Sequence, residues 1–199
     1  PSSEKITDSS GIKQSETKYY YDLQPFGSIN KGNLTRQEQW LIGTSFIDIE
    51  RSYSSEGVLV KELDPRDKAT TYTLDDDHLY PTTITNALNQ ATKIEVDYSS
   101  GKPTKTTDPN GAIATTVFDA FDRPIEEKQS SASDASTLET KTTYAYVAQS
   151  IGQQTKRSDY LSDAVSKDSY AYTDGFDRPI QTRVEAESEN QFSVTDTVY

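Results

Sequence analysis

Two copies of the pentapeptide Phe-Asp-Arg-Pro-Ile, at Phe121–Ile125 and Phe176–Ile180, decide how the rest of this sequence is interpreted. The copies lie 55 residues apart. Each copy follows a short run that ends in an aromatic residue, Phe118 in the first and Tyr172 in the second, and each leads into a polar run of β-like composition. Chance is a poor explanation for a match of this length in the same context. We therefore infer an internal repeat, which is the sequence signature of an array of supersecondary units.

Working outward from the first copy, the segment 106–125 contains a turn, a Thr-rich run and a second turn. Asp108 at the first position, Pro109 at the second and Gly111 at the fourth fit a type I turn, and Asp64-Pro65 predicts another. The repeat signature comprises Asp108, Pro109, Gly111, Phe118, Asp119, Asp122 and Arg123 in the first copy, and Tyr172, Asp174, Gly175, Asp177 and Arg178 in the second.

Short runs of alternating polarity cover most of the chain from Tyr19 onward. In residues 93–98 the side chains of Ile94, Val96 and Tyr98 fall on one face, and the three charged side chains fall on the other. Similar runs predict strands at 45–52, 58–63, 70–74, 112–118, 140–147, 168–172 and 180–186, with turns at 56–57, 86–89, 99–101, 108–111 and 174–175. No long run has helical spacing, and only 159–166 leaves room for a short helical turn.

The composition agrees with a thin, all-β structure. Only 32% of the residues are hydrophobic, which is little for a thick core, while Thr and Tyr suit a half-buried pleated surface. The net charge of −12 would repel phosphate backbones and anionic membranes, so we expect no nucleic-acid partner and no membrane insertion by this segment. The absence of cysteine excludes disulfides, thiolate metal sites and a cysteine nucleophile. Residues 1–18 are expected to form a polar arm or edge strand, and residues 19–199 the repeat region.

The quoted motifs resemble the Rhs/YD repeats, in which Tyr-Asp-x-x-Gly-Arg precedes a strand and often follows an Asp-Pro-x-Gly turn. Phe118 replaces the Tyr of that pattern, and Asp122 and Asp177 replace its Gly. Because Asp is among the few residues that tolerate positive φ, the second replacement is conformationally cheap. The second copy is similar to the variant in Tc toxin B subunits and SpvB-like proteins, as are Trp40–Gly43 and the end of the chain, Phe192–Tyr199.

The resemblance implies consecutive antiparallel hairpins that form a curved or spiralled sheet, part of a hollow shell around a C-terminal toxic domain. It implies a secreted bacterial protein in which this segment is wall rather than enzyme, without cofactor or metal. The expected partners are the remainder of the shell and the enclosed toxin. Exposed sheet edges would also permit self-association. Since the chain begins without Met, we expect a piece of a longer protein.

Several functional alternatives remain open. His78 follows three aspartates and invites a metal or acid–base site, but a solvated turn is the better interpretation because three successive carboxylates do not face one ion along a strand. Arg123 and Arg178 are expected to brace the sheet by pairing with a carboxylate or carbonyl of a neighbouring strand. Thirteen tyrosines would suit a carbohydrate-binding or adhesion module, although such rings more often fill a sheet face while the hydroxyl reaches water or backbone. A glycoside hydrolase would need a carboxyl pair with one raised pKa.

Overall fold

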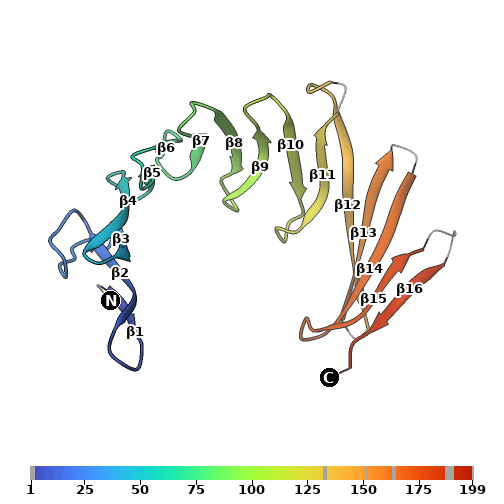
Figure 1. Ribbon diagram of the computed structural model, residues 1–199. Coiled ribbons are helices and arrows are strands. Elements are labelled where there is room, and N and C mark those ends of the chain that lie inside the picture. Colours follow the sequence, from blue (N-terminus) through green and yellow to red (C-terminus); the bar gives the residue numbers. More distant parts are fainter. Residues whose placement is uncertain (1–2, 132–133, 151, 163–164, 187–190, 199) are drawn as a thin grey trace. The chain divides into compact units, whose positions relative to one another are not determined.

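The computed structural model describes residues 3–131, 134–150, 152–162, 165–186 and 191–198. Within these ranges the regular structure is entirely strand and turn (Figure 1). In the same residues, no helix has the length and hydropathy to cross a bilayer. The all-β class that the sequence predicts is confirmed.

Sixteen strands follow one another along the described chain. In the first half they are β1 (Ser3–Thr7), β2 (Lys13–Tyr21), β3 (Leu34–Ile42), β4 (Ser45–Tyr53), β5 (Leu59–Leu63), β6 (Ala69–Leu74), β7 (Pro81–Thr85) and β8 (Ala91–Asp97). In the second half they are β9 (Lys102–Thr107), β10 (Ile113–Phe118), β11 (Pro124–Ser130), β12 (Leu138–Gln149), β13 (Gly152–Ser162), β14 (Val165–Asp174), β15 (Pro179–Glu185) and β16 (Phe192–Asp196).

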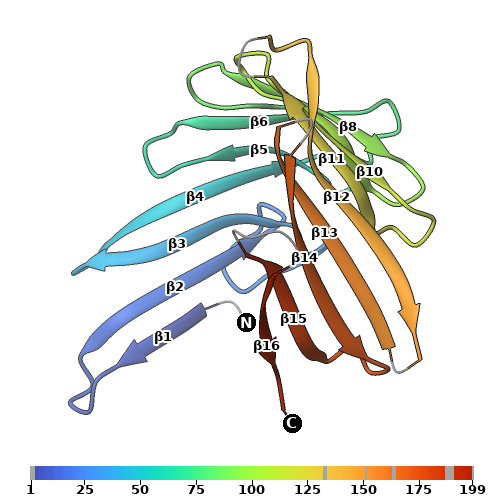
Figure 2. The same cartoon turned by 90° about the vertical axis from the view of Figure 1, so that its right-hand side faces the viewer.

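The strand order in the sheet is the order in the sequence, from β1 to β16, so that consecutive strands are neighbours. Neighbouring strands pair antiparallel. For example, Thr116 in β10 lies opposite Glu127 in β11, and Tyr144 in β12 lies opposite Arg157 in β13. The predicted chain of consecutive antiparallel hairpins is confirmed. Compact units form at residues 1–94 and 95–199. Within the second unit, β12, β13 and β14 lie side by side (Figure 2).

Every strand expected from alternating polarity is present, with small shifts at its ends. The helical turn expected within 159–166 is wrong for the described residues of that segment, because β13 continues to Ser162 and β14 begins at Val165. Asp159 lies opposite Lys167 and Tyr160 opposite Ser166. Cross-strand pairing within the β13–β14 hairpin supplies the backbone partners here, and it outweighs the weak strand preference of the individual residues.

The N-terminal segment is also part of the sheet. β1 and β2 pair as a hairpin, with Glu4 opposite Thr17, and β2 runs without interruption through the position between residues 18 and 19 where the sequence suggested a change. β1 lies at the edge of the strand order.

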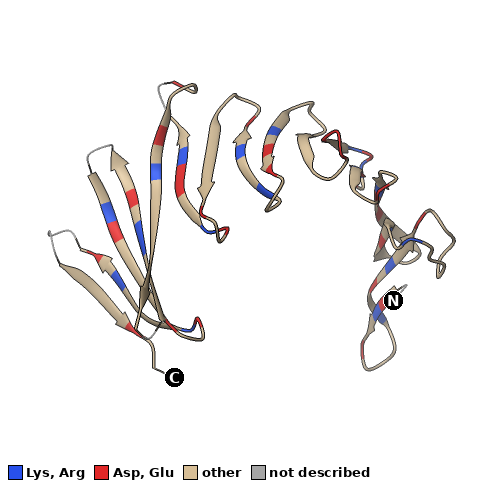
Figure 3. Ribbon diagram, turned by 180° about the vertical axis from the view of Figure 1, so that it is seen from behind, with Lys and Arg blue, Asp and Glu red and all other residues tan. Residues whose placement is uncertain are grey.

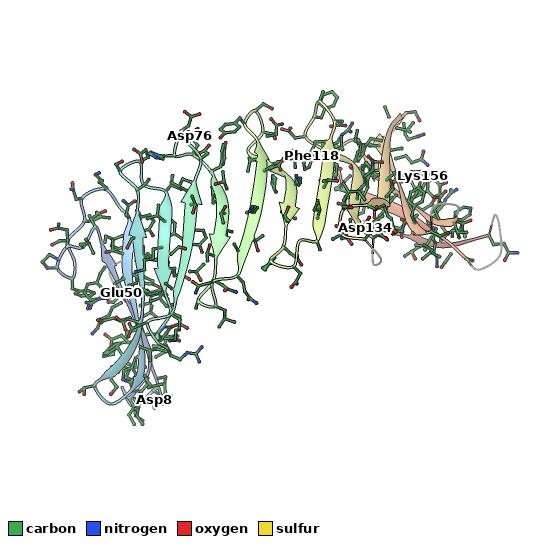
Figure 4. All side chains as sticks on the ribbon, turned by 90° about the horizontal axis from the view of Figure 1, so that it is seen from above. Asp8, Glu50, Asp76, Phe118, Asp134 and Lys156 are labelled. Carbon is green, nitrogen blue, oxygen red and sulfur yellow. The ribbon has the colours of Figure 1, made fainter. Side chains whose placement is uncertain are left out.

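The sheet has no hydrophobic core of its own. Among the described residues no hydrophobic side chain is buried, and the buried residues are Thr35, Asp75, Thr142 and Ser158. The accessible surface is 13409 Å², whereas a compact protein of this mass exposes about 9,400 Å². Figure 4 shows side chains standing along the strands of each unit without a helix packed over them. Hydrogen bonding between strands, and not a packed interior, therefore organises each unit.

Side-chain exposure alternates along the strands, but the difference between the two faces is small. In β8 the side chains of Lys93 and Glu95 are exposed, while Ile94 and Val96 are only half-buried. β8 ends at Asp97, so that Tyr98, which was expected within this strand on the same face as Ile94, lies in the following turn and is 56% exposed.

Candidate functional site

One turn geometry recurs at the ends of the hairpins. In each case the fourth residue has positive φ, and its N–H donates to the carbonyl of the first residue. A side-chain oxygen of that first residue accepts backbone N–H groups farther along the turn, which is the turn-forming role that Asp, Asn and Ser share. The turns of this kind are opened by Asp8, Ser54, Asp64, Asp75, Asn86, Asp108, Asp119 and Asp174.

The predicted turn at 108–111 has this geometry. The N–H of Gly111 donates to the carbonyl of Asp108 over 3.0 Å, and the Asp108 carboxylate accepts from the N–H groups of Asn110 and Ala112 at 2.8 Å each. Gly111 has a φ of 89°, a conformation that glycine adopts without penalty. Pro109 occupies the second position, where its fixed φ suits a type I turn.

The two Phe-Asp-Arg-Pro-Ile copies form turns with equivalent hydrogen bonds. The Asp119 and Asp174 carboxylates each accept the N–H of the third residue at 2.9 Å and that of the fifth residue at 3.0 Å. Asp122 and Asp177 have φ values of 59° and 60°, so both aspartates occupy the left-handed position that the sequence assigned to them. The positive φ of the second turn lies at Asp177, and Gly175 does not share it.

Arg123 and Arg178 each pair with the aspartate that opens their own turn. The Nη2–Oδ2 distances are 2.7 Å for Arg123 and 2.6 Å for Arg178, and each Nε also donates to the same carboxylate at 2.8 Å. The carboxylate partner is thus local, four residues back at the end of the preceding strand. Each guanidinium lowers the pKa of its aspartate below the ordinary value and is the largest cause of that shift.

Arg123 also connects its turn to the next hairpin. Its Nη1 donates to Gln153 Oε1 in β13 at 3.0 Å, and its guanidinium lies 4.0 Å from the ring centre of Tyr146 in β12. The Tyr146 hydroxyl donates to the carbonyl of Pro124 at 2.9 Å. Tyr53 makes the same kind of bond in the first unit, to the carbonyl of Leu34 at 2.9 Å. At these two positions the ring covers the sheet while the hydroxyl reaches backbone.

Sequence reasoning missed the loop of residues 22–33 between β2 and β3. The Asp22 carboxylate accepts four backbone N–H groups, those of residues 30–33, at 2.7 to 3.0 Å. These bonds hold the pKa of Asp22 below its ordinary value, with the Gly32 N–H as the largest cause. Asp22 and Leu23 both have positive φ, at 55° and 57°. The signal in the sequence was a gap between strand-like runs that contains Pro25, Gly27 and Gly32.

Two shallow cavities lie beside this loop, with volumes of about 260 and about 320 Å³. Leu23, Thr35 and Arg51 line both of them. Arg51 Nε donates to Glu62 at 2.8 Å, while Arg51 Nη1 is shielded from solvent and has no hydrogen-bond partner among the described residues.

The Asp75–His78 segment is a turn. The Asp75 carboxylate accepts the N–H groups of Leu79 and Tyr80 at 2.7 and 3.1 Å, so it is committed to the backbone. His78 Nδ1 lies 3.6 Å from a carboxylate oxygen of Glu56, whose pKa is lowered to about 2, chiefly by the Ser55 hydroxyl. In the described part of the chain, no three His, Asp or Glu side chains gather as metal ligands.

The faces of the second unit carry ion pairs and hydrogen bonds between neighbouring strands. Lys156 pairs with Asp168 at 2.7 Å, and Ser158 donates to the same carboxylate at 2.6 Å. Residues of both charge signs lie along these strands (Figure 3). A glycosidase acid needs a raised pKa. The pKa is instead lowered at the following carboxyl groups: Glu16, Asp22, Glu56, Asp64, Asp97, Asp119, Asp134, Glu139, Asp168 and Asp174.

This hairpin array can be compared with known proteins. No protein-family model matches the chain, and no curated protein matches it in sequence. Among solved structures, that of TcdB2-TccC3 matches with a TM-score of 0.67 and 12% identity over 93% of this chain and 13% of that chain. The chain has the fold of the matched part of the Tc toxin structure.

Other Tc structures give the same result. TcdB2-TccC3 without its hypervariable C-terminal region matches with a TM-score of 0.62 and 12% identity, over 94% of this chain and 16% of that one. A Photorhabdus luminescens Tc holotoxin pore with a TccC3 mutation matches with a TM-score of 0.52 and 11% identity, over 98% and 13%. The chain thus spans a small fraction of the Tc chains it matches. At these identities the likeness concerns the fold, and it supports the resemblance read from the repeat motifs.

Proposed function

We propose that this chain is a wall segment of a secreted bacterial Rhs/Tc-type shell that encloses a C-terminal toxic domain. The observation that carries the proposal is a sheet of consecutive hairpins with no buried hydrophobic side chain among its described residues. A free-standing domain of this length normally buries a core. A sheet without one gains stability when further protein packs along its edges and faces.

The arrangement of side chains supports a structural role. Asp carboxylates bind backbone amides in the turns, arginines bind those carboxylates, and tyrosine hydroxyls bind carbonyls. These groups form hydrogen bonds that fix the register of the hairpins, and a container wall needs hairpins of fixed register. In a neighbouring Tc structure the C-terminal region is described as hypervariable, which suits a scaffold whose contents vary. The division into an arm at residues 1–18 and a repeat region at 19–199 is part of the same proposal, as is export.

The proposal is tested on the full-length protein that contains this segment. Limited proteolysis with a small protease, followed by mass spectrometry, reports whether the region C-terminal to the repeats is protected. We expect its cleavage to begin only under conditions that unfold the repeat region. Cleavage of that region while the repeats remain folded would show that nothing is enclosed.

A binding test separates the proposal from the adhesion alternative. Glycan-array and calorimetric titrations with the same protein should give no saturable binding that depends on Tyr146 or Tyr172. Saturable binding that disappears on replacing either tyrosine, with the fold retained, would favour a carbohydrate-binding module.

A further inference from the structure

We propose that Phe121 and Phe176 are paired anchors that insert into another strip of hairpin repeats, so that this edge of the second unit docks against a neighbouring segment of the same parent protein. The inference rests on the proposed wall function and specifies which residues make contact. It begins from an unusual exposure: the two rings are 79% and 84% exposed at the tips of their turns.

The turn itself does not require an aromatic residue at this position. Other turns with the same backbone hydrogen bonds carry Ser10, Glu56, Arg66, Leu88 or Asn110 as their third residue. The demands of the turn fall on the first residue, which accepts the amides, and on the fourth, which takes positive φ. The phenylalanines are therefore available for another purpose, and exposed aromatic side chains on rigid turns are typical anchors of protein interfaces.

Both rings lie against the arginine of their own turn in the same way. The guanidinium of Arg123 lies 5.2 Å from the ring centre of Phe121, and that of Arg178 lies 5.5 Å from that of Phe176. Each arginine is itself fixed by its bonds to the aspartate that opens the turn. Because the turn is already ordered, little conformational entropy remains to be lost on docking.

The spacing of the tips identifies the partner. The β10–β11 and β14–β15 turns lie at the same end of their hairpins, with one hairpin between them (Figure 1). Four strand spacings separate them, or about 19 Å along the hydrogen-bonding direction. A strip of antiparallel hairpins repeats every two strands, about 9.6 Å, so the two anchors are two periods apart and meet equivalent positions on such a strip.

The neighbouring Tc chains supply a reason to expect such a strip. This chain covers only 13% and 16% of the two TcdB2-TccC3 chains that it matches. A parent protein of that size has further β-sheet beyond this segment to provide the sites, here called sockets, into which the two rings insert. Each tip also carries an aspartate at its fourth position, Asp122 or Asp177, next to the ring, so the sockets should be apolar with a basic rim.

Alkylation of single cysteines tests the docking in the full-length protein. This segment contains no cysteine, so Phe121→Cys and Phe176→Cys each introduce one reporter whose modification is followed on its own peptide by mass spectrometry. Replacing one anchor at a time leaves the other in place. Arg66→Cys is the matched control, because Arg66 holds the same turn position with a side chain that is 84% exposed.

Relative to the urea-unfolded protein, we expect alkylation at positions 121 and 176 to slow by about tenfold or more, and alkylation at position 66 to slow little. A short cross-linker attached at position 121 should then map to a hairpin repeat elsewhere in the same chain. Equal, rapid alkylation at all three positions would overturn the proposal, as would equal protection at all three. A cross-link to the C-terminal region or to another protein would also overturn it.

This test is independent of enclosure. If position 121 is protected and cross-linked to a repeat while the C-terminal region is freely cleaved, the docking holds and the proposed container function fails. If the C-terminal region is protected while position 121 reacts rapidly, the container function holds and the proposed docking of the two phenylalanines is wrong.

Discussion

The loop of residues 22–33 and the tip of residues 119–123 are connections of different length that are organised in the same way. In both, one aspartate carboxylate gathers backbone N–H groups that the sheet cannot satisfy. Asp22 binds four amides of its long loop, whereas Asp119 binds two amides and the Arg123 guanidinium. A carboxylate has several acceptor positions, so it can replace a missing ladder partner in either setting. The comparison shows that a single aspartate organises each of these two hairpin ends, whatever the length of the connection.

Acid should have the largest effect, because it acts on both kinds of hairpin end at once. The pKa values of Asp22 and Asp119 are lowered in the fold by the groups that bind them. A lowered pKa means stability that is present above the ordinary value of 3.8 and is lost as pH falls through the folded-state value. We expect the urea midpoint of the full-length protein to fall as the pH drops below the ordinary aspartate pKa of 3.8.

The double variant Asp119→Asn with Asp174→Asn should show a shallower fall over the same range, since two of the titrating groups are gone. A midpoint that is flat in acid for the unaltered protein would contradict the role given to the carboxylates.

Removing the Asp22 carboxylate should have the next largest effect, confined to the long loop. Asp22→Gly retains the ability to adopt positive φ and removes only the acceptor, so the amides of residues 30–33 lose their partner. We expect these amides to exchange with deuterium about tenfold faster or more. In Asp22→Asn, which keeps one acceptor oxygen, these amides should exchange at a rate between those of the unaltered protein and Asp22→Gly. Unchanged exchange in Asp22→Gly would show that the loop is ordered by other contacts.

The left-handed residue of the tight turn gives a smaller, purely conformational effect. Asp122→Ala should reduce the free energy of unfolding by about 1 kcal/mol, because Ala tolerates positive φ less well than Asp. Asp122→Gly should be neutral or slightly stabilising. Denaturant unfolding distinguishes the two variants, and equal losses for Ala and Gly would mean that the Asp122 carboxylate, and not its φ, is what matters.

The smallest expected effect concerns the tyrosine that braces the first tip. Tyr146→Phe removes the hydroxyl bond to the Pro124 carbonyl and keeps the ring beneath Arg123, so we expect a loss of about 0.5–1 kcal/mol. Tyr146→Leu also removes the ring contact and should cost more. If both variants lose the same amount in chemical denaturation, the cation–ring contact contributes nothing.

Much of the fold was predictable because its signals are local. The turn at 108–111 and the positive φ at Asp122 and Asp177 follow from which residues tolerate these conformations. Other features depend on pairing between strands or on contacts between hairpins, which local preference does not reveal. The 159–166 segment looked poorly suited to a strand, yet β13 and β14 pair through it, and the contact of Arg123 with Gln153 spans 30 residues.

The sequence by itself determined the all-β class and several of the turn positions, since Asp, Asn, Pro and Gly set backbone dihedrals within four or five residues. The hairpin order came from the resemblance of its motifs to Rhs/YD repeats. Only the tertiary structure decided that no hydrophobic side chain is buried among the described residues, that Asp22 folds a long loop around itself, and that two phenylalanines stand exposed on one edge. Burial and exposure depend on which side chains of neighbouring strands lie alongside, and the residue types within one turn or strand do not specify these.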